Sequence, residues 1–122
     1  MHDNGAKILR LRASPFAQAK ASTDAANLRS VLSAATIEYA EKGNLDDLTA
    51  SVPTSKVDDD YGIVKIVKNG DALEAFYVKN ASDTTGISIT ELTAIAESGT
   101  DSHGSASITC ETGFTAKTIT CN

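Results

Sequence analysis

Few residues in this chain combine the types and the spacing that catalysis or metal binding requires. Ser102 beside His103 pairs a nucleophile with a base. Neighbours in sequence rarely adopt the geometry of proton transfer, however, and a Gly/Ser-rich loop holds them poorly. Asp58, Asp59 and Asp60 offer carboxylates for calcium, but a calcium loop separates its acidic ligands with other residues and a glycine. We therefore expect a solvated acidic turn here, and no enzyme activity, no metal and no cofactor.

The two cysteines, Cys110 and Cys121, are the residues best suited to form a covalent bond. They flank a stretch centred on Gly113, with Ile108 in one arm and residues 118–120 in the other. Two antiparallel arms joined by a loop would bring the thiols within bridging distance, and the bridge would stabilise the fold by roughly 3 kcal/mol. We expect this disulfide and an oxidising compartment. The alternative is two buried, reduced cysteines; a zinc site would need more ligands than the chain's two histidines add.

Length and charge limit the remaining function classes. A chain of 122 residues fits one domain with a modest core of its own. The formal net charge of -5 argues against a nucleic-acid backbone or an anionic membrane surface as partner, because Lys and Arg supply most of the binding to both. Aromatic residues make up only 5%, so the core must be built from Ile, Val, Leu and Ala.

The candidate residues named above must be positioned by a long helix, expected over about residues 17–42, and by the strands that follow it. The helix has two stripes of positions that alternate by threes and fours, which places each stripe on one side of the helix. The apolar stripe is predicted to face the core and includes Leu28, Leu32, Ala35 and Tyr39. The opposite stripe carries small side chains that would let another helix approach: Thr23, Asn27, Ser30 and Ala34.

The remainder of the chain, residues 61–122, is predicted to be rich in strands. Gly43 after Lys42 ends the helix, and residues 43–60 form a polar loop. Asn-Gly between the apolar runs 63–68 and 72–79 predicts a hairpin.

Three lysines, Lys65, Lys68 and Lys79, are expected on the exposed face of this hairpin or at its ends. Residues 87–97 are predicted to form a short strand that leads into a helical turn capped by Thr90. Residues 98–105 are expected to be a loop before the cysteine hairpin.

The first sixteen residues differ in composition from everything downstream. Their apolar run at residues 8–12 is too short and too interrupted by arginine for a signal peptide or a membrane span. An oxidised cysteine pair without an export signal is contradictory unless the native N-terminus has been replaced. We interpret residues 1–16 as an expression leader and residues 17–122 as one globular domain; the alternative is a native basic arm.

The order of helix, polar loop, antiparallel hairpins and terminal cysteine pair resembles the soluble domain of a type IV pilin. The resemblance covers residues 18–122 and rests on the stretch 19–30, on Tyr39 near the helix end, and on Cys110 and Cys121. It implies an α+β fold in which the long N-terminal helix packs on an antiparallel β-sheet and a disulfide bounds the C-terminal hairpin. The prepilin cleavage sequence of that family is not found in residues 1–16.

The resemblance also implies a function, a location and partners. The chain would be a structural subunit of an extracellular type IV pilus, assembled with other pilin subunits, and attached to the inner membrane only through an N-terminal stalk that is missing here. The stripe Thr23, Asn27, Ser30 and Ala34 would line the filament interior. Two alternatives stay open: a pseudopilin of a secretion system, or a secreted, disulfide-bonded adhesin or binding module. A filament subunit predicts that the second helix face is exposed in the isolated domain, whereas an adhesin predicts that its own domain covers it.

Overall fold

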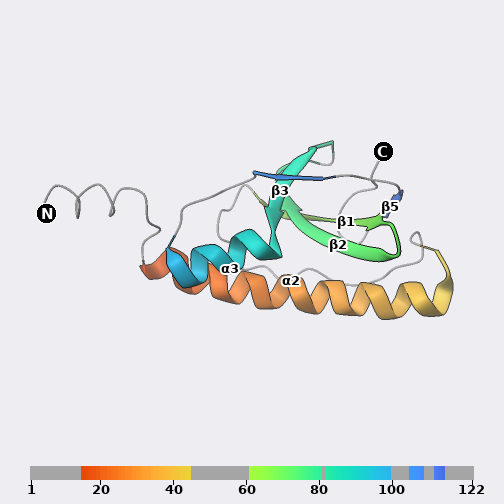
Figure 1. Ribbon diagram of the computed structural model, residues 1–122, viewed down its shortest axis with the longest axis horizontal. Helices are drawn as coiled ribbons and strands as arrows, with labels where there is room; N and C mark the ends of the chain where they lie inside the picture. Colours follow the sequence, from red (N-terminus) through yellow and green to blue (C-terminus); the bar gives the residue numbers. More distant parts are fainter. Residues whose placement is uncertain (1–14, 45–60, 81, 100–104, 109–111, 115–122) are drawn as a thin grey trace, which may run out of the picture.

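The computed structural model describes residues 15–44, 61–80, 82–99, 105–108 and 112–114. These residues form two helices and five strands (Figure 1). In chain order the elements are α2 (Pro15–Lys42), β1 (Ile63–Asn69), β2 (Ala72–Val78), β3 (Thr85–Ser88), α3 (Ile89–Ser98), β4 (Ala106–Ser107) and β5 (Thr112–Phe114).

The long helix α2 spans 28 residues, so the prediction of a helix to Lys42 is confirmed. It begins at Pro15, where the fixed φ of proline suits the first helical turn. The boundary predicted between a leader, residues 1–16, and the globular domain therefore falls inside α2. Its end is also as expected: Gly43 adopts φ 75° and donates its backbone N–H to the carbonyl of Tyr39 at 2.8 Å, which satisfies a carbonyl of the last turn.

The five strands form one antiparallel sheet in the order β4-β3-β2-β1-β5. Its centre is the predicted hairpin, in which Asn69 pairs with Ala72 across a two-residue turn. Gly70 has φ 66° in this turn, a conformation that glycine adopts without steric cost. The α+β prediction, with the long helix packed on an antiparallel sheet, is confirmed.

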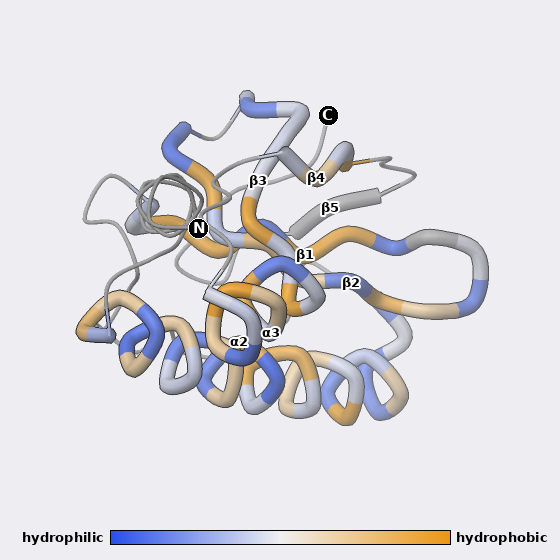
Figure 2. Tube along the Cα trace, turned by 60° about the vertical axis from the view of Figure 1, so that its left-hand side comes forward, coloured by the Kyte–Doolittle hydropathy of each residue, from blue (hydrophilic) through white to orange (hydrophobic). Residues whose placement is uncertain are grey.

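The sheet separates two apolar clusters. Both helices lie along the same face of the sheet (Figure 1), and α2 contacts both α3 and β2. Val64, Ile66 and Tyr77 point to this side and join the helices in the main core. The other face holds a smaller cluster of Val67, Phe76, Val78 and Ile108. In Figure 2 the two central strands carry long apolar stretches, whereas α2 alternates between polar and apolar turns.

The segment from β3 into α3 confirms the predicted strand and helix, but the predicted cap is wrong. Ser88, not Thr90, is the N-cap: its hydroxyl accepts from the Glu91 backbone at 3.1 Å, and the Glu91 carboxylate accepts from the Ser88 backbone at 3.0 Å. This capping box places the N-cap of α3 two residues before the predicted cap at Thr90. Gly99 closes the helix with φ 73°.

The C-terminal segment differs from the prediction at Gly113, whereas the second predicted arm, residues 118–120, lies outside the described residues. Gly113, expected at the centre of a loop, lies in β5 and pairs with Val67 of β1. Strand β4 pairs with β3 at the opposite edge of the sheet. The physical reason is that β1 and β3 each leave one edge open, and a short extended segment can satisfy the backbone groups of each edge. The predicted disulfide lies outside the described residues, because Cys110 and Cys121 do not belong to them.

Candidate functional site

The outer face of α2, turned away from the sheet, is the candidate functional surface. Ala21, Ala25, Leu28, Val31 and Ala35 are buried on the inner side of the helix. The outer face is exposed along its whole length, and most residues on it are Ala, Ser or Thr. Its exposed members are Phe16, Ala19, Ser22, Thr23, Ala26, Arg29, Ser30, Ser33, Ala34, Ile37, Ala40 and Glu41.

The stripe predicted to line a filament interior lies on this outer face. Thr23, Ser30 and Ala34 are exposed, and Asn27 is half-buried at the edge of the face. Ile37 extends the stripe by one turn and keeps 62% of its surface exposed. An isolated apolar side chain on a protein surface is ordinary, but here it continues a face whose one exposed acidic residue, Glu41, lies one turn further on.

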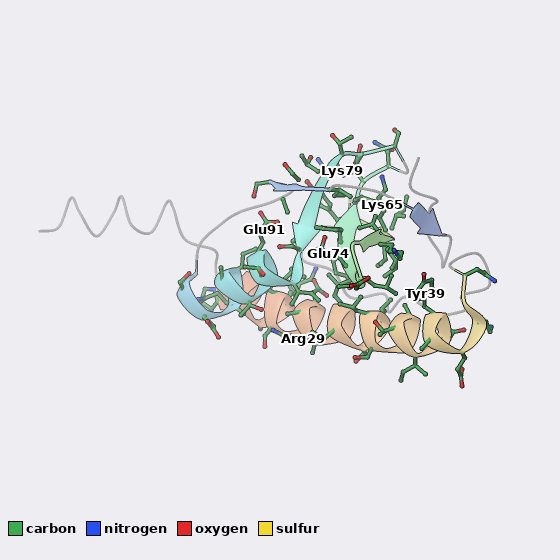
Figure 3. All side chains as sticks on the ribbon, turned by 45° about the vertical axis from the view of Figure 1, so that its right-hand side comes forward. Arg29, Tyr39, Lys65, Glu74, Lys79 and Glu91 are labelled. Atoms are coloured by element: carbon green, nitrogen blue, oxygen red, sulfur yellow. The ribbon has the colours of Figure 1, made fainter. Side chains whose placement is uncertain are left out.

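All four residues of the predicted core stripe pack on the main core, but only two of them are fully buried. Leu28 and Ala35 are fully buried, but Leu32 and Tyr39 are only half-buried. Leu32 lines an open pocket of about 150 Å³ between α2, β2 and the start of α3. Figure 3 shows Tyr39 on the side of α2 that faces the sheet. Val31 takes the buried place that the sequence prediction gave to Leu32.

A buried carboxylate, missed at the sequence level, lies on the inner side of α2. Asp24 has no exposed surface, and it is near Tyr77 of β2, since its negative charge acts on the phenol. A signal was present in the sequence: Asp24 is three residues after Ala21 and four before Leu28, so it shares their side of the helix.

The environment of Tyr77 shifts its acidity. Burial of the phenol, and secondly the charge of Asp24, raise the pKa of Tyr77 from 10.0 to about 12, because both disfavour the phenolate. The folded state therefore keeps a proton that the unfolded state loses above pH 10. The free energy of unfolding is therefore independent of this ionisation below pH 10 and falls as the pH rises from 10 to about 12. Among the described residues, the Tyr77 hydroxyl has no hydrogen-bond partner.

The prediction that Lys65 is exposed is wrong. Lys65 keeps only 4% of its surface accessible and its Nζ donates to the backbone carbonyl of Asp83 at 2.9 Å. The Asp83 carboxylate in turn accepts from the backbone N–H groups of Lys79 and Asn80. A lysine is tolerated here because its ammonium is hydrogen-bonded while its stem packs on the sheet. Figure 3 places Lys65 on the sheet.

The other two lysines agree better with the prediction. Lys68 is half-buried at the end of β1 and donates to the Gly70 carbonyl at 2.8 Å. Lys79 is exposed, and its Nζ lies 5.2 Å from the centre of the Tyr61 ring, a cation–π contact. The two side chains belong to opposite ends of the hairpin, so the structure does not bring the three lysines together.

Helix α3 lies beside the N-terminal half of α2 and shares a polar contact with it. The guanidinium of Arg29 donates to the Thr93 hydroxyl at 2.8 Å. A groove of about 140 Å³ runs between the helices at this point, lined by Ser22, Ala25, Arg29, Thr93, Ala96 and Glu97. Arg29 is thereby drawn toward α3 at the border of the outer face.

Several candidate residues lie outside the described part of the chain. These are Cys110, Cys121, Ser102, His103 and the acidic run 58–60. Within the described ranges, no three carboxylate, histidine or cysteine side chains come together to hold a metal ion. In the same part of the chain, neither helix combines the length and the apolarity needed to cross a membrane.

Comparison with known proteins gives no assignment. No family model, no curated protein and no solved structure matches this chain. The function must therefore be inferred from the residues of the chain itself.

Proposed function

We propose that this chain is the globular domain of a structural filament subunit of the type IV pilin kind. The proposal combines two observations: a long helix packed by one side on an antiparallel sheet, and the resemblance of the sequence to pilin domains. Assembly with like subunits at the cell surface, and attachment to the inner membrane through an N-terminal stalk, belong to the same proposal.

The observation that carries the proposal is the composition of the outer face of α2. A helix side that faces water normally holds many charged residues. Here the exposed positions between Ala19 and Ile37 include a single charged residue, Arg29, and that side chain is hydrogen-bonded to Thr93 of α3. Small side chains let the backbones of two helices approach closely, as they do between helices in membranes. The outer face suits contact with another helix better than lasting contact with water.

The exposure of this face favours a filament subunit over the adhesin alternative. A self-contained adhesin or binding module has no need to keep one side of its longest helix uncharged and open. The adhesin alternative predicted instead that the domain itself covers this helix face. A pseudopilin of a secretion system would use the same surface with different partners, and it is therefore the second candidate.

The test is a charge placed in the outer face of the full-length native protein. Ala34→Arg should abolish or strongly reduce surface filaments, because a bulky cation would keep the helices apart. Its melting temperature as an isolated domain should stay within a few degrees of wild type, since Ala34 is exposed.

The matched control is Ala72→Arg, which makes the same change at an exposed position beside the hairpin turn. This variant should assemble normally. Normal filaments that contain the Ala34→Arg subunit would contradict the proposal, and so would a wild-type strain whose filaments never contain this protein.

A further inference from the structure

The two large apolar side chains exposed in the described part of the chain both lie on the outer face of α2. Phe16 is 74% exposed and Ile37 is 62% exposed. They are three heptads apart, so they occupy the same heptad position of the helix. The heptad pattern that they define continues without a charged residue from one end of α2 to the other. Its positions are Phe16, Ala19, Thr23, Ala26, Ser30, Ser33, Ile37 and Ala40, all exposed; we call them the seam.

The seam is complementary to itself when the second copy runs in the opposite direction. The two-fold axis crosses the seam at the level of residue 28 along the helix. Phe16 of one copy then lies opposite Ala40 of the other, and Ala19 lies opposite Ile37. Ser, Thr and Ala face one another in the four layers between. Each large side chain is thus matched with an alanine, which keeps the distance between the helices nearly uniform.

A parallel pair has no such match. It would place Phe16 against Phe16 and Ile37 against Ile37, so the bulky layers would hold the helices apart where the Ser and Thr layers need them close. The small residues would then lose most of their contacts.

The charges beside the seam also favour the antiparallel arrangement. Lys20 lies near the N-terminal end of one flank, and Glu41 lies near the C-terminal end of the same flank. Antiparallel pairing brings the Lys20 end of one copy to the Glu41 end of the other, whereas parallel pairing brings like charges to the same level. The helix dipoles are also opposed in the antiparallel pair. Arg29, near the centre, is directed to Thr93 on its own α3, away from the seam.

We propose that the seam is a self-association surface, through which α2 pairs antiparallel with α2 of a second copy of this chain. The pair is isologous, so each half of the seam is used once by each copy and the contact closes as a dimer. This inference does not depend on a filament, because it needs only the chain itself. It uses the face proposed for the filament contact, so one subunit would make one of the two contacts at a time.

Cysteine cross-linking determines both the contact and its direction. Ala19→Cys and Ile37→Cys are made as separate variants, mixed, and oxidised, and the linked sites are identified by peptide mapping so that Cys110 and Cys121 are accounted for. Antiparallel pairing predicts a link between position 19 of one copy and position 37 of the other in the mixture. Neither variant alone should link at its new site, because the two copies of residue 19 would be about 27 Å apart along the axis. Links between identical positions, or no link, would overturn the proposal.

Sedimentation equilibrium of the chain tests the affinity and its chemistry. Wild type should dimerise with a dissociation constant below about 1 mM. A chain that remains monomeric at that concentration would overturn the proposal. Ile37→Asp should weaken the dimer at least tenfold with an unchanged melting temperature, because Ile37 is exposed in the monomer. Thr90→Asp, an exposed position outside the seam, is the control and should leave the dimer unchanged.

A charge exchange provides the second check on direction. Lys20→Glu should weaken the dimer, and the double variant Lys20→Glu with Glu41→Lys should restore it, since the opposite charges still meet between copies. Failure of the double variant to restore the dimer would overturn the antiparallel assignment. A chain that is monomeric but still enters filaments would refute this inference and leave the proposed function intact.

Discussion

Truncation of Leu28 should be the most damaging single change on α2. Leu28 has no exposed surface and lies in the main core with Ala25, Val64 and Tyr77. Replacing it with alanine removes about three buried carbon groups, worth about 2.4 kcal/mol in transfer free energy. The cavity left behind adds about 1 kcal/mol more. We therefore expect Leu28→Ala to lower the free energy of unfolding by about 3–4 kcal/mol.

Leu32→Ala provides an internal comparison on the same helix. Leu32 is half-buried and already lines an open pocket, so its truncation enlarges a space that water can enter and creates no sealed void. The expected loss is about 1–2 kcal/mol, below the usual range for a fully buried leucine. Ser30→Ala, on the exposed outer face, should change stability by no more than about 0.5 kcal/mol.

Equilibrium unfolding in urea measures this ranking directly. With a slope of about 1–3 kcal/mol per molar urea for a small domain, Leu28→Ala should move the midpoint by at least about 1 M. The slopes should agree among the variants, so that midpoints can be compared. If Leu32→Ala costs as much as Leu28→Ala, or if Ser30→Ala costs as much as either, then the two faces of α2 have been assigned incorrectly.

Five further predictions concern other parts of the chain. Between pH 10 and 12 the wild type should lose about 2–3 kcal/mol that Tyr77→Phe does not lose; equal alkaline profiles would contradict the shifted pKa of Tyr77. At pH 7 the same variant should be at least as stable as wild type by urea unfolding, because it removes a buried hydroxyl. Gly86→Ala should cost about 1–3 kcal/mol by urea unfolding, because a Cβ there would lie 2.6 Å from the Tyr77 carbonyl oxygen. Ser88→Ala should cost about 1 kcal/mol through loss of the cap, and a melting temperature equal to wild type would disprove it. Alkylation followed by intact-mass measurement should reveal thiols at Cys110 and Cys121 only after reduction, and free thiols in untreated protein would exclude the bridge.

The sequence predicts the parts of the fold that depend on local chemistry. Helical periodicity and Gly43 placed α2 and its end, and Asn69-Gly70 placed the central hairpin, because such signals act over a few residues. The burial of Lys65 could not be predicted, since it depends on the Asp83 carbonyl 18 residues away. The outer stripe of the candidate surface was found from spacing alone, but the heptad match between its two ends becomes meaningful only when every position is known to be exposed.

The order of the strands also determines when the sheet can be completed during synthesis. Both edge strands, β4 and β5, come from the last part of the described chain, while the central hairpin is made much earlier. A nascent chain that has just finished α3 therefore holds a three-stranded sheet with two open edges, and both edges can pair with another chain. Folding of this domain is consequently tied to the arrival of its C-terminal segment, which closes both edges within a few residues of each other.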